Sequence, residues 1–72
     1  MKWNVDIYLT DDTKILLDDL KLIKYVMSDL KSVSNFTDFI LPDSRSLIFV
    51  SDTKVVSVQS KSVKYLEFIK VD

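Results

Sequence analysis

The sequence contains no cysteine, no histidine and no glycine, and these absences exclude several kinds of site. Without cysteine or histidine there is no disulfide framework, no thiol nucleophile, no imidazole base and no zinc site of the usual kind. Without glycine there is no phosphate-cradling glycine loop and no dinucleotide-binding fingerprint. A 72-residue domain that lacks both disulfides and metal depends on hydrophobic packing for its stability, and no cofactor is expected.

An excess of charge of one sign and long hydrophobic runs are also missing. Ten basic residues stand against eleven acidic ones, and the net charge of −1 is too small for a dedicated DNA-binding protein. No apolar run approaches the roughly 18–20 residues that span a bilayer, and the N-terminal residues lack the apolar core of a signal peptide. We therefore expect a cytoplasmic protein with no membrane association.

Hydrophobic residues, in contrast, are abundant. They make up 47% of the chain, more than such a short chain can bury internally. A second copy is the expected cover for the excess, so we predict a homo-oligomer. The last segment, 63–71, is apolar on both faces, and its Leu66 and Phe68 are the predicted interface residues.

Two stretches of the chain, forty positions apart, repeat each other. Residues 11–26 and 51–66 share six identical residues in sixteen positions, and four more positions exchange one aliphatic residue for another. The repeat extends over 3–26 and 43–66, joined by a connector at 28–45, within a single domain covering 1–72. A fixed period of this kind indicates one supersecondary unit used twice, although turn-rich strands drawn from few residue types also converge.

Residues 14–30 fit two secondary structures. Their apolar residues fall at helical spacing, which by itself indicates an amphipathic helix. The matching segment 54–70 indicates a strand, a polar turn and a strand, because it is rich in β-branched and aromatic residues. If both copies share a fold, 14–26 is also strand, turn and strand, with Asp18 and Asp19 at the turn. We adopt this β interpretation and keep an α+β fold with a helix at about 14–30 as the alternative.

The β interpretation predicts a six-stranded, all-β domain. Two similar three-stranded meanders would form a small barrel or sandwich of the SH3-like or Sm-like kind, and a closed barrel has no exposed strand edges. Within the connector, Phe36 and Phe39 are expected to plug one end of the barrel. The predicted strands cover residues 5–9, 14–17, 21–27, 47–50, 54–58 and 63–71.

A lysine–tyrosine pair occurs at the same place in both copies, as Lys24-Tyr25 and Lys64-Tyr65. Together with Trp3, these side chains can form a surface on which bases stack while lysines meet phosphates. The alternative is that the tyrosines are half-buried strand residues beside solvated lysines. Because neighbouring strand residues point to opposite faces, each pair commits only one member to a given surface.

Arg45 is the one arginine, and its planar guanidinium can make a two-point contact with a phosphate or carboxylate. It also fits the description of an ordinary solvent-exposed loop residue. The aspartates at 11, 12, 18, 19 and 52 suit turns and match no calcium-binding loop. No metal site and no catalytic residue is therefore expected.

Three segments carry a resemblance to a group of known proteins. They are Asn35-Phe36-Thr37-Asp38-Phe39, the run from Leu47 to Val58, and Lys64-Tyr65-Leu66-Glu67-Phe68-Ile69. With its glycine-free vocabulary, the chain resembles the small uncharacterised all-β proteins encoded by phages and prophages of low-GC Gram-positive bacteria. The resemblance spans most of the chain and implies a compact accessory factor that acts by binding in the cytoplasm of the host cell. It transfers no functional residues.

These observations predict a non-enzymatic binding module. Its expected partner is a host protein or a small nucleotide signal, which the module would sequester as a phage-type accessory or anti-defence factor. Two alternatives stay open: a small barrel that binds nucleic acid, and a structural subunit of a virion. A nucleic-acid binder would be distinguished by an affinity that falls steeply with salt.

Overall fold

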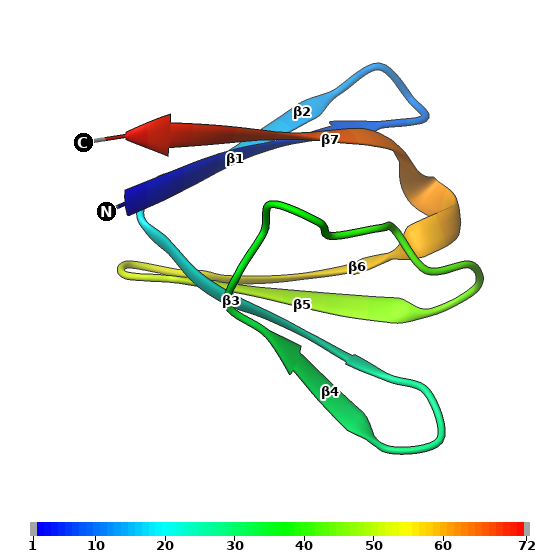
Figure 1. Ribbon diagram of the computed structural model, residues 1–72. Helices are drawn as coiled ribbons and strands as arrows, with labels where there is room; N and C mark the ends of the chain where they lie inside the picture. Colours follow the sequence, from blue (N-terminus) through cyan, green and yellow to red (C-terminus); the bar gives the residue numbers. More distant parts are fainter. Residues whose placement is uncertain (1, 72) are drawn as a thin grey trace.

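The computed structural model describes residues 2–71, which form seven β-strands in two antiparallel sheets (Figure 1). The strand order is β2-β1-β7 in the first, called sheet A, and β4-β3-β5-β6 in the second, sheet B. A single turn of 3-10 helix, η1, links β6 to β7. The bounds are β1 Lys2–Leu9, β2 Lys14–Leu17, β3 Leu20–Val26, β4 Leu30–Val33, β5 Ser46–Ser51, β6 Val55–Gln59, η1 Ser60–Ser62 and β7 Val63–Val71.

The all-β prediction is confirmed, and the alternative with a helix at about 14–30 is wrong. β2 and β3 occupy that segment, and the chain turns between them at Asp18 and Asp19. Asp19 has a φ of 54°, in the left-handed region, which a continuous right-handed helix does not allow. Residues 2–71 contain no α-helix, and hence none that is long and apolar enough to cross a membrane.

Of the two predicted architectures, the sandwich agrees with the structure and the barrel is wrong, as are the count of six strands and the two three-stranded meanders. The structure has two separate sheets, as in a small β-sandwich, and no strand pairing among the described residues joins them. A seventh strand, β4, arises within the connector and pairs with β3, where Val26 lies opposite Leu30. Because β4 covers the outer edge of β3, that edge is not available to close a barrel.

The third strand of each half leaves its own hairpin. β1 and β2 pair in sheet A, but β3 crosses to sheet B and pairs with β5. β5 and β6 pair in sheet B, while β7 crosses to sheet A and pairs with β1. The first crossing takes only Asp18 and Asp19, and the Asp19 N–H donates to Asn4 Oδ1 at 3.0 Å. The two halves are therefore interlocked, and neither sheet forms from one half alone.

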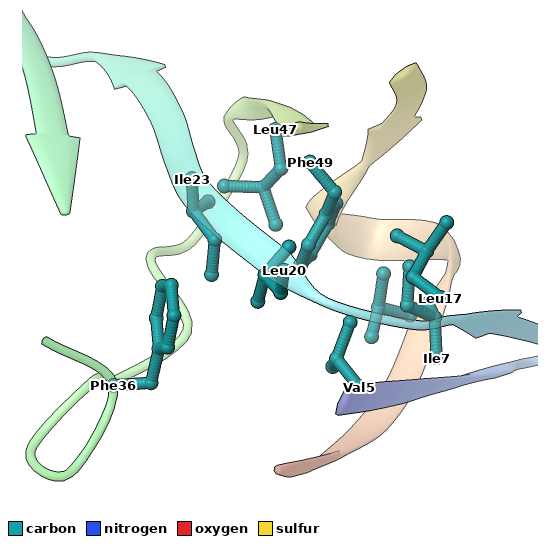
Figure 2. Packing of buried hydrophobic residues seen from close by; sticks show 9 residues of the cluster. Val5, Ile7, Leu17, Leu20, Ile23, Phe36, Leu47 and Phe49 are labelled. Carbon is teal, nitrogen blue, oxygen red and sulfur yellow. The ribbon is translucent and has the colours of Figure 1, made fainter. Parts of the chain in front are cut away.

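The core lies between the two sheets and is built from alternate residues of their strands (Figure 2). Phe36 comes from the connector, which runs in green between the sheets in Figure 1, and only 3% of its surface is exposed. This burial confirms the prediction that Phe36 is a core plug. Burying one such side chain contributes about 1.5–3 kcal/mol. The other buried hydrophobic residues are Val5, Ile7, Leu17, Leu20, Ile23, Leu47, Phe49 and Val63.

Because the chain has no glycine, other residues occupy its left-handed backbone positions. These residues are Asp12, Asp19 and Ser44, with φ of 71°, 54° and 52°. Aspartate tolerates this region better than most residues because its short side chain bonds nearby backbone. In the β1–β2 turn, Asp11 accepts hydrogen bonds from the Thr13 hydroxyl and N–H, which lower the pKa of Asp11 below its usual range. The aspartates thus act as turn formers.

Candidate ligand-binding site

The two lysine–tyrosine pairs lie in different sheets and face different surroundings. Tyr25 lies on β3 and points to the inner side of sheet B, where its ring meets the Phe39 ring edge-on with centroids 6.3 Å apart. Tyr65 lies on β7 and points to the outer side of sheet A, where it stacks on Tyr8. The repeat therefore does not produce two equivalent half-sites.

A difference in the position of two β-bulges explains why the tyrosines diverge. In β3, the register with β5 shifts between Leu20 and Leu22, before Tyr25 is reached. In β7, the register with β1 shifts between Val63 and Tyr65, so that Lys64 is the extra residue. An extra residue reverses the alternation of side chains beyond it. Matched positions in the repeat consequently point to opposite faces.

The ends of β3 and β5 bring Lys24, Tyr25 and Arg45 together around one hollow, called the Lys24–Arg45 hollow. Its volume is about 360 Å³. Three of the predicted ligand-binding residues thus line the same depression, although they lie twenty positions apart in the sequence. The remaining lining residues are Val26, Met27, Leu30, Ser44, Ser46 and Ile48.

Strand pairing and main-chain hydrogen bonds fix the backbone positions of the two cationic residues of the hollow, Lys24 and Arg45. Lys24 lies directly opposite Ile48, on the outer face of sheet B. Arg45 immediately precedes β5, and its N–H donates to the Ser60 hydroxyl at 2.8 Å. Its carbonyl oxygen accepts the Ser60 N–H at 2.7 Å. Arg45 is therefore anchored through its backbone, and its side chain is not needed to hold this turn.

Neither cation of the hollow is neutralised by a carboxylate of the described chain. The two ion pairs within residues 2–71 are Lys21–Asp19 and Lys64–Asp12. The lining residues of the hollow include no aspartate or glutamate. Lys24 and Arg45 therefore present two positive charges that can meet an anionic ligand.

One wall of the hollow is apolar and open to solvent. Val26 and Leu30 form a cross-strand pair on β3 and β4 and are 57% and 63% exposed, and Met27 beside them is also exposed. Large apolar side chains grouped on a surface indicate a site of interaction. Beside two cations, they suit a ligand that has an anionic part and a flat apolar part.

The other predicted ligand residues lie on sheet A, away from this hollow. Lys64 pairs with Asp12 at 3.3 Å, and Tyr65 is stacked on Tyr8. Trp3 meets the Phe36 ring edge-on, and the Lys70 ammonium lies 5.5 Å above the Trp3 ring. The ammonium groups of Lys64 and Lys70 are therefore already engaged with partners in the described chain.

The outer face of sheet A is unfavourable for phosphate. Asp6 and Glu67 lie opposite each other on β1 and β7, close to the two stacked tyrosines. Partial desolvation, followed by the negative charges of Glu67 and Asp6, raises the pKa of Tyr8 above its usual value. A surface that already disfavours a tyrosinate also disfavours an anionic ligand.

The predicted interface residues point to the inner side of β7. Phe68 stacks on Phe36 with centroids 5.4 Å apart and meets the edge of Phe39 at 5.8 Å. Leu66 is likewise partly buried and packs against the core. What is left exposed of both residues borders a groove along the outer edge of β7. An oligomer through this region stays a prediction.

Several lining residues of the hollow were not anticipated from the sequence. Met27 and Leu30 fit the helical spacing that was set aside, and Ser44 stands in an irregular segment. If the sequence had indicated β4, the pairing of Val26 with Leu30 and hence the apolar wall could have been predicted. No family model, curated protein or solved structure matches the chain.

Proposed function

We propose that this protein is a non-enzymatic binding module that holds a small nucleotide in the Lys24–Arg45 hollow. The observation that carries the proposal is the position of two unpaired cations beside an exposed apolar wall. A nucleotide combines an anionic phosphate with a flat base whose faces pack against apolar side chains, which matches both parts of the hollow. Tyr25, at the inner border, adds an aromatic side chain next to the cations.

The two cations have different roles in this arrangement. The Arg45 guanidinium donates two parallel hydrogen bonds to phosphate oxygens, and its anchored backbone limits the entropy lost on binding. Lys24 supplies a mobile point charge from the neighbouring strand. The base packs against Val26, Met27 and Leu30, and the hydroxyls of Ser44 and Ser46 are further hydrogen-bonding groups at the rim.

The lining of the hollow supports retention of a ligand over its chemical conversion. It contains amines, hydroxyls and apolar groups, and none of its side chains is a carboxylate, imidazole or thiol. A serine hydroxyl becomes a nucleophile when an adjacent general base activates it, and the lining places no carboxylate or imidazole beside Ser44 or Ser46. A module that binds a nucleotide without converting it lowers the free concentration of that nucleotide. This is the action expected of a phage-type accessory factor that removes a host signal.

Calorimetry with nucleoside monophosphates, nucleoside diphosphates and cyclic dinucleotides tests the proposal. Arg45→Ala and Lys24→Ala should each weaken binding about tenfold or more, since a hydrogen bond to a charged group contributes roughly 1.5–3 kcal/mol. Arg45→Lys should restore only part of the affinity, because an ammonium does not form the two-point contact.

Two controls make this experiment decisive. Lys54→Ala removes an exposed lysine at the β5–β6 turn and should leave the affinity unchanged. The nucleosides without phosphate should bind much more weakly than the nucleotides. The proposal fails if none of these nucleotides binds, or if Lys54→Ala weakens binding as much as Arg45→Ala does.

Binding measurements on the same purified protein distinguish the alternative partners. A nucleic-acid binder would show an affinity that falls steeply with salt and oligonucleotides that bind better than mononucleotides. A host-protein inhibitor would yield a stoichiometric complex that survives moderate salt, with no nucleotide bound. Two cations in a hollow of limited size favour the small nucleotide.

A further inference from the structure

One edge strand of the molecule is long and unoccupied. β7 has nine residues, whereas the other edge strands, β2, β4 and β6, have four, four and five. β7 pairs with β1 along one side, and beyond the Val63 N–H, which donates to the Ser60 carbonyl, none of the turn and loop hydrogen bonds of residues 2–71 involves β7. Half of the backbone groups of an edge strand point away from its neighbour, so β7 offers them to another strand.

Comparison of the two sheets shows what this edge lacks. β3 and β7 hold matching places, since each is the third strand of its half and pairs with the first strand of the other half. The far side of β3 is covered by β4, and sheet B therefore has four strands. The far side of β7 carries no strand among the described residues, and sheet A has three.

An apolar groove runs beside the free edge of β7. Its volume is about 320 Å³. One wall is formed by β7 itself and the other by the connector, which contributes Phe39 and Leu41. Pairing a strand with β7 would continue sheet A over this groove and cover both walls. The lining residues from β7 are Lys64, Tyr65, Leu66 and Phe68.

We propose that the free edge of β7 is the contact between two copies of this chain, which pair β7 with β7 in antiparallel fashion. The product is one continuous six-stranded sheet in the order β2-β1-β7-β7-β1-β2. This inference does not depend on the nucleotide site, which lies on the other sheet. A symmetric contact of this kind uses the same patch on both copies and closes at two.

Two-fold symmetry leaves few registers for this pairing. In an antiparallel pair of strands, side chains at directly opposite positions share one face of the sheet. The two-fold axis therefore runs perpendicular to the sheet, and at the axis one residue of β7 lies opposite the same residue of the other copy. A register centred on Glu67 would place Glu67 against Glu67 and Lys64 against Lys70. Like charges directly opposite each other are destabilising.

A register centred on Leu66 avoids these repulsions. It places Leu66 against Leu66 over the apolar groove and Tyr65 against Glu67 on the outer face. The tyrosine hydroxyl can donate to the Glu67 carboxylate of the other copy, whose neighbour across β1 is the like-charged Asp6. The avoidance of like-charge contacts and the apolar groove that each copy contributes thus favour a second copy as the occupant.

The absence of cysteine from the chain permits a direct test of the register. Directly opposite residues of antiparallel strands have Cα atoms about 4.5–5.5 Å apart, within the range of a disulfide. We expect Leu66→Cys to form covalent dimers on mild oxidation, in preference to Glu67→Cys and Phe68→Cys. Val55→Cys, on the edge strand β6, is the matched control and should stay monomeric on a non-reducing gel.

Because Leu66 is partly buried, a second pair of variants uses exposed positions. Tyr65→Cys and Glu67→Cys both lie on the outer face of β7, and only a mixture of the two should form abundant disulfide dimers. The unmodified protein should sediment as a dimer at high micromolar concentration. A monomer at that concentration overturns the proposal, as does cross-linking through Val55→Cys. Preferential cross-linking of Glu67→Cys or Phe68→Cys overturns the register.

Discussion

Tyr8 and Tyr65 form a stacked pair on the outer face of sheet A, with ring centroids 4.3 Å apart and planes inclined by 15°. They lie directly opposite each other on β1 and β7, and the bulge at Lys64 is what turns Tyr65 to this side. The Lys14 ammonium lies 5.4 Å from the centre of the Tyr8 ring. The pair is therefore a cross-strand contact that helps to hold β7 on β1, and it lies apart from the Lys24–Arg45 hollow.

Tyr65→Ala should leave the protein folded at room temperature. The Tyr65 side chain is 49% exposed, and an aromatic pair contributes about 0.5–1.5 kcal/mol beyond its buried area. Urea unfolding followed by circular dichroism measures the loss, and Tyr65→Phe, which keeps the stacked ring, is the control. Unfolding of Tyr65→Ala without denaturant would show that the side chain has a core role.

Glu67→Gln should lower the pKa of Tyr8. Partial desolvation and the negative charge of Glu67 hold this pKa above its usual value, and the substitution removes the charge. NMR titration of the Tyr8 ring measures the change, and Glu67→Asp, which keeps the charge, should retain most of the shift. An unchanged Tyr8 pKa in Glu67→Gln would contradict the assigned cause.

Because the pKa of Tyr8 is raised in the folded protein, the free energy of unfolding should depend on pH in the alkaline range. As the pH rises past the usual tyrosine pKa, the unfolded chain loses this proton while the folded chain keeps it. The free energy of unfolding should therefore decrease in that range, and Tyr8→Phe should remove part of the decrease. Denaturant unfolding across alkaline pH compares the two proteins, and parallel curves would contradict the expectation.

Phe36→Ala should destabilise the protein by about 3–5 kcal/mol, the usual cost of emptying a buried aromatic site. Phe36 is 3% exposed and contacts Trp3 and Phe68, so its loss opens a cavity between the connector and sheet A. Phe39→Ala should cost less, because Phe39 is only half-buried. Equal losses in the two variants, measured by urea unfolding, would contradict this ranking.

Ser44→Gly should stabilise the protein by several tenths of a kcal/mol up to about 1 kcal/mol, because Ser44 has a φ of 52° that glycine adopts without strain. Ser57→Gly is the matched control. Ser57 lies exposed within β6, where glycine weakens a strand, so this variant should be less stable than the parent. Thermal unfolding ranks the three proteins, and a Ser44→Gly variant below the parent would contradict the strain argument.

Several elements were predictable from local sequence. The segments that became β1, β5, β6 and β7 carry β-branched and aromatic residues between polar turns. β2 and β3 were predicted from the repeat, because the spacing of their own apolar residues is helical. Asp12 and Asp19 occupy turn positions because the chain offers no glycine for left-handed backbone. β4 was missed because Leu30–Val33 is short, and its pairing with β3 depends on a neighbour that local pattern does not specify.

The candidate site was predictable only as a set of residue types. Lys24, Tyr25 and Arg45 were named from their chemistry, and the structure groups them in one hollow. Lys64, Tyr65 and Trp3 were named for the same reasons and lie on the other sheet. The exposed wall of Val26, Met27 and Leu30 could not be foreseen without knowledge of β4.

The sequence by itself determined the class of the fold, through strand and turn propensities in most segments and, over residues 14–30, through the comparison of the two copies of the repeat. It also determined which chemistry the chain does not have, since histidine, cysteine and glycine are missing. Only the tertiary structure decided that β3 and β7 exchange sheets and that one tyrosine of the repeat faces inward and the other outward. These outcomes depend on the position of a single bulge in each strand, which is set by long-range pairing and packing. A shift of one residue reverses every side chain beyond it, so similar sequences acquire different surfaces.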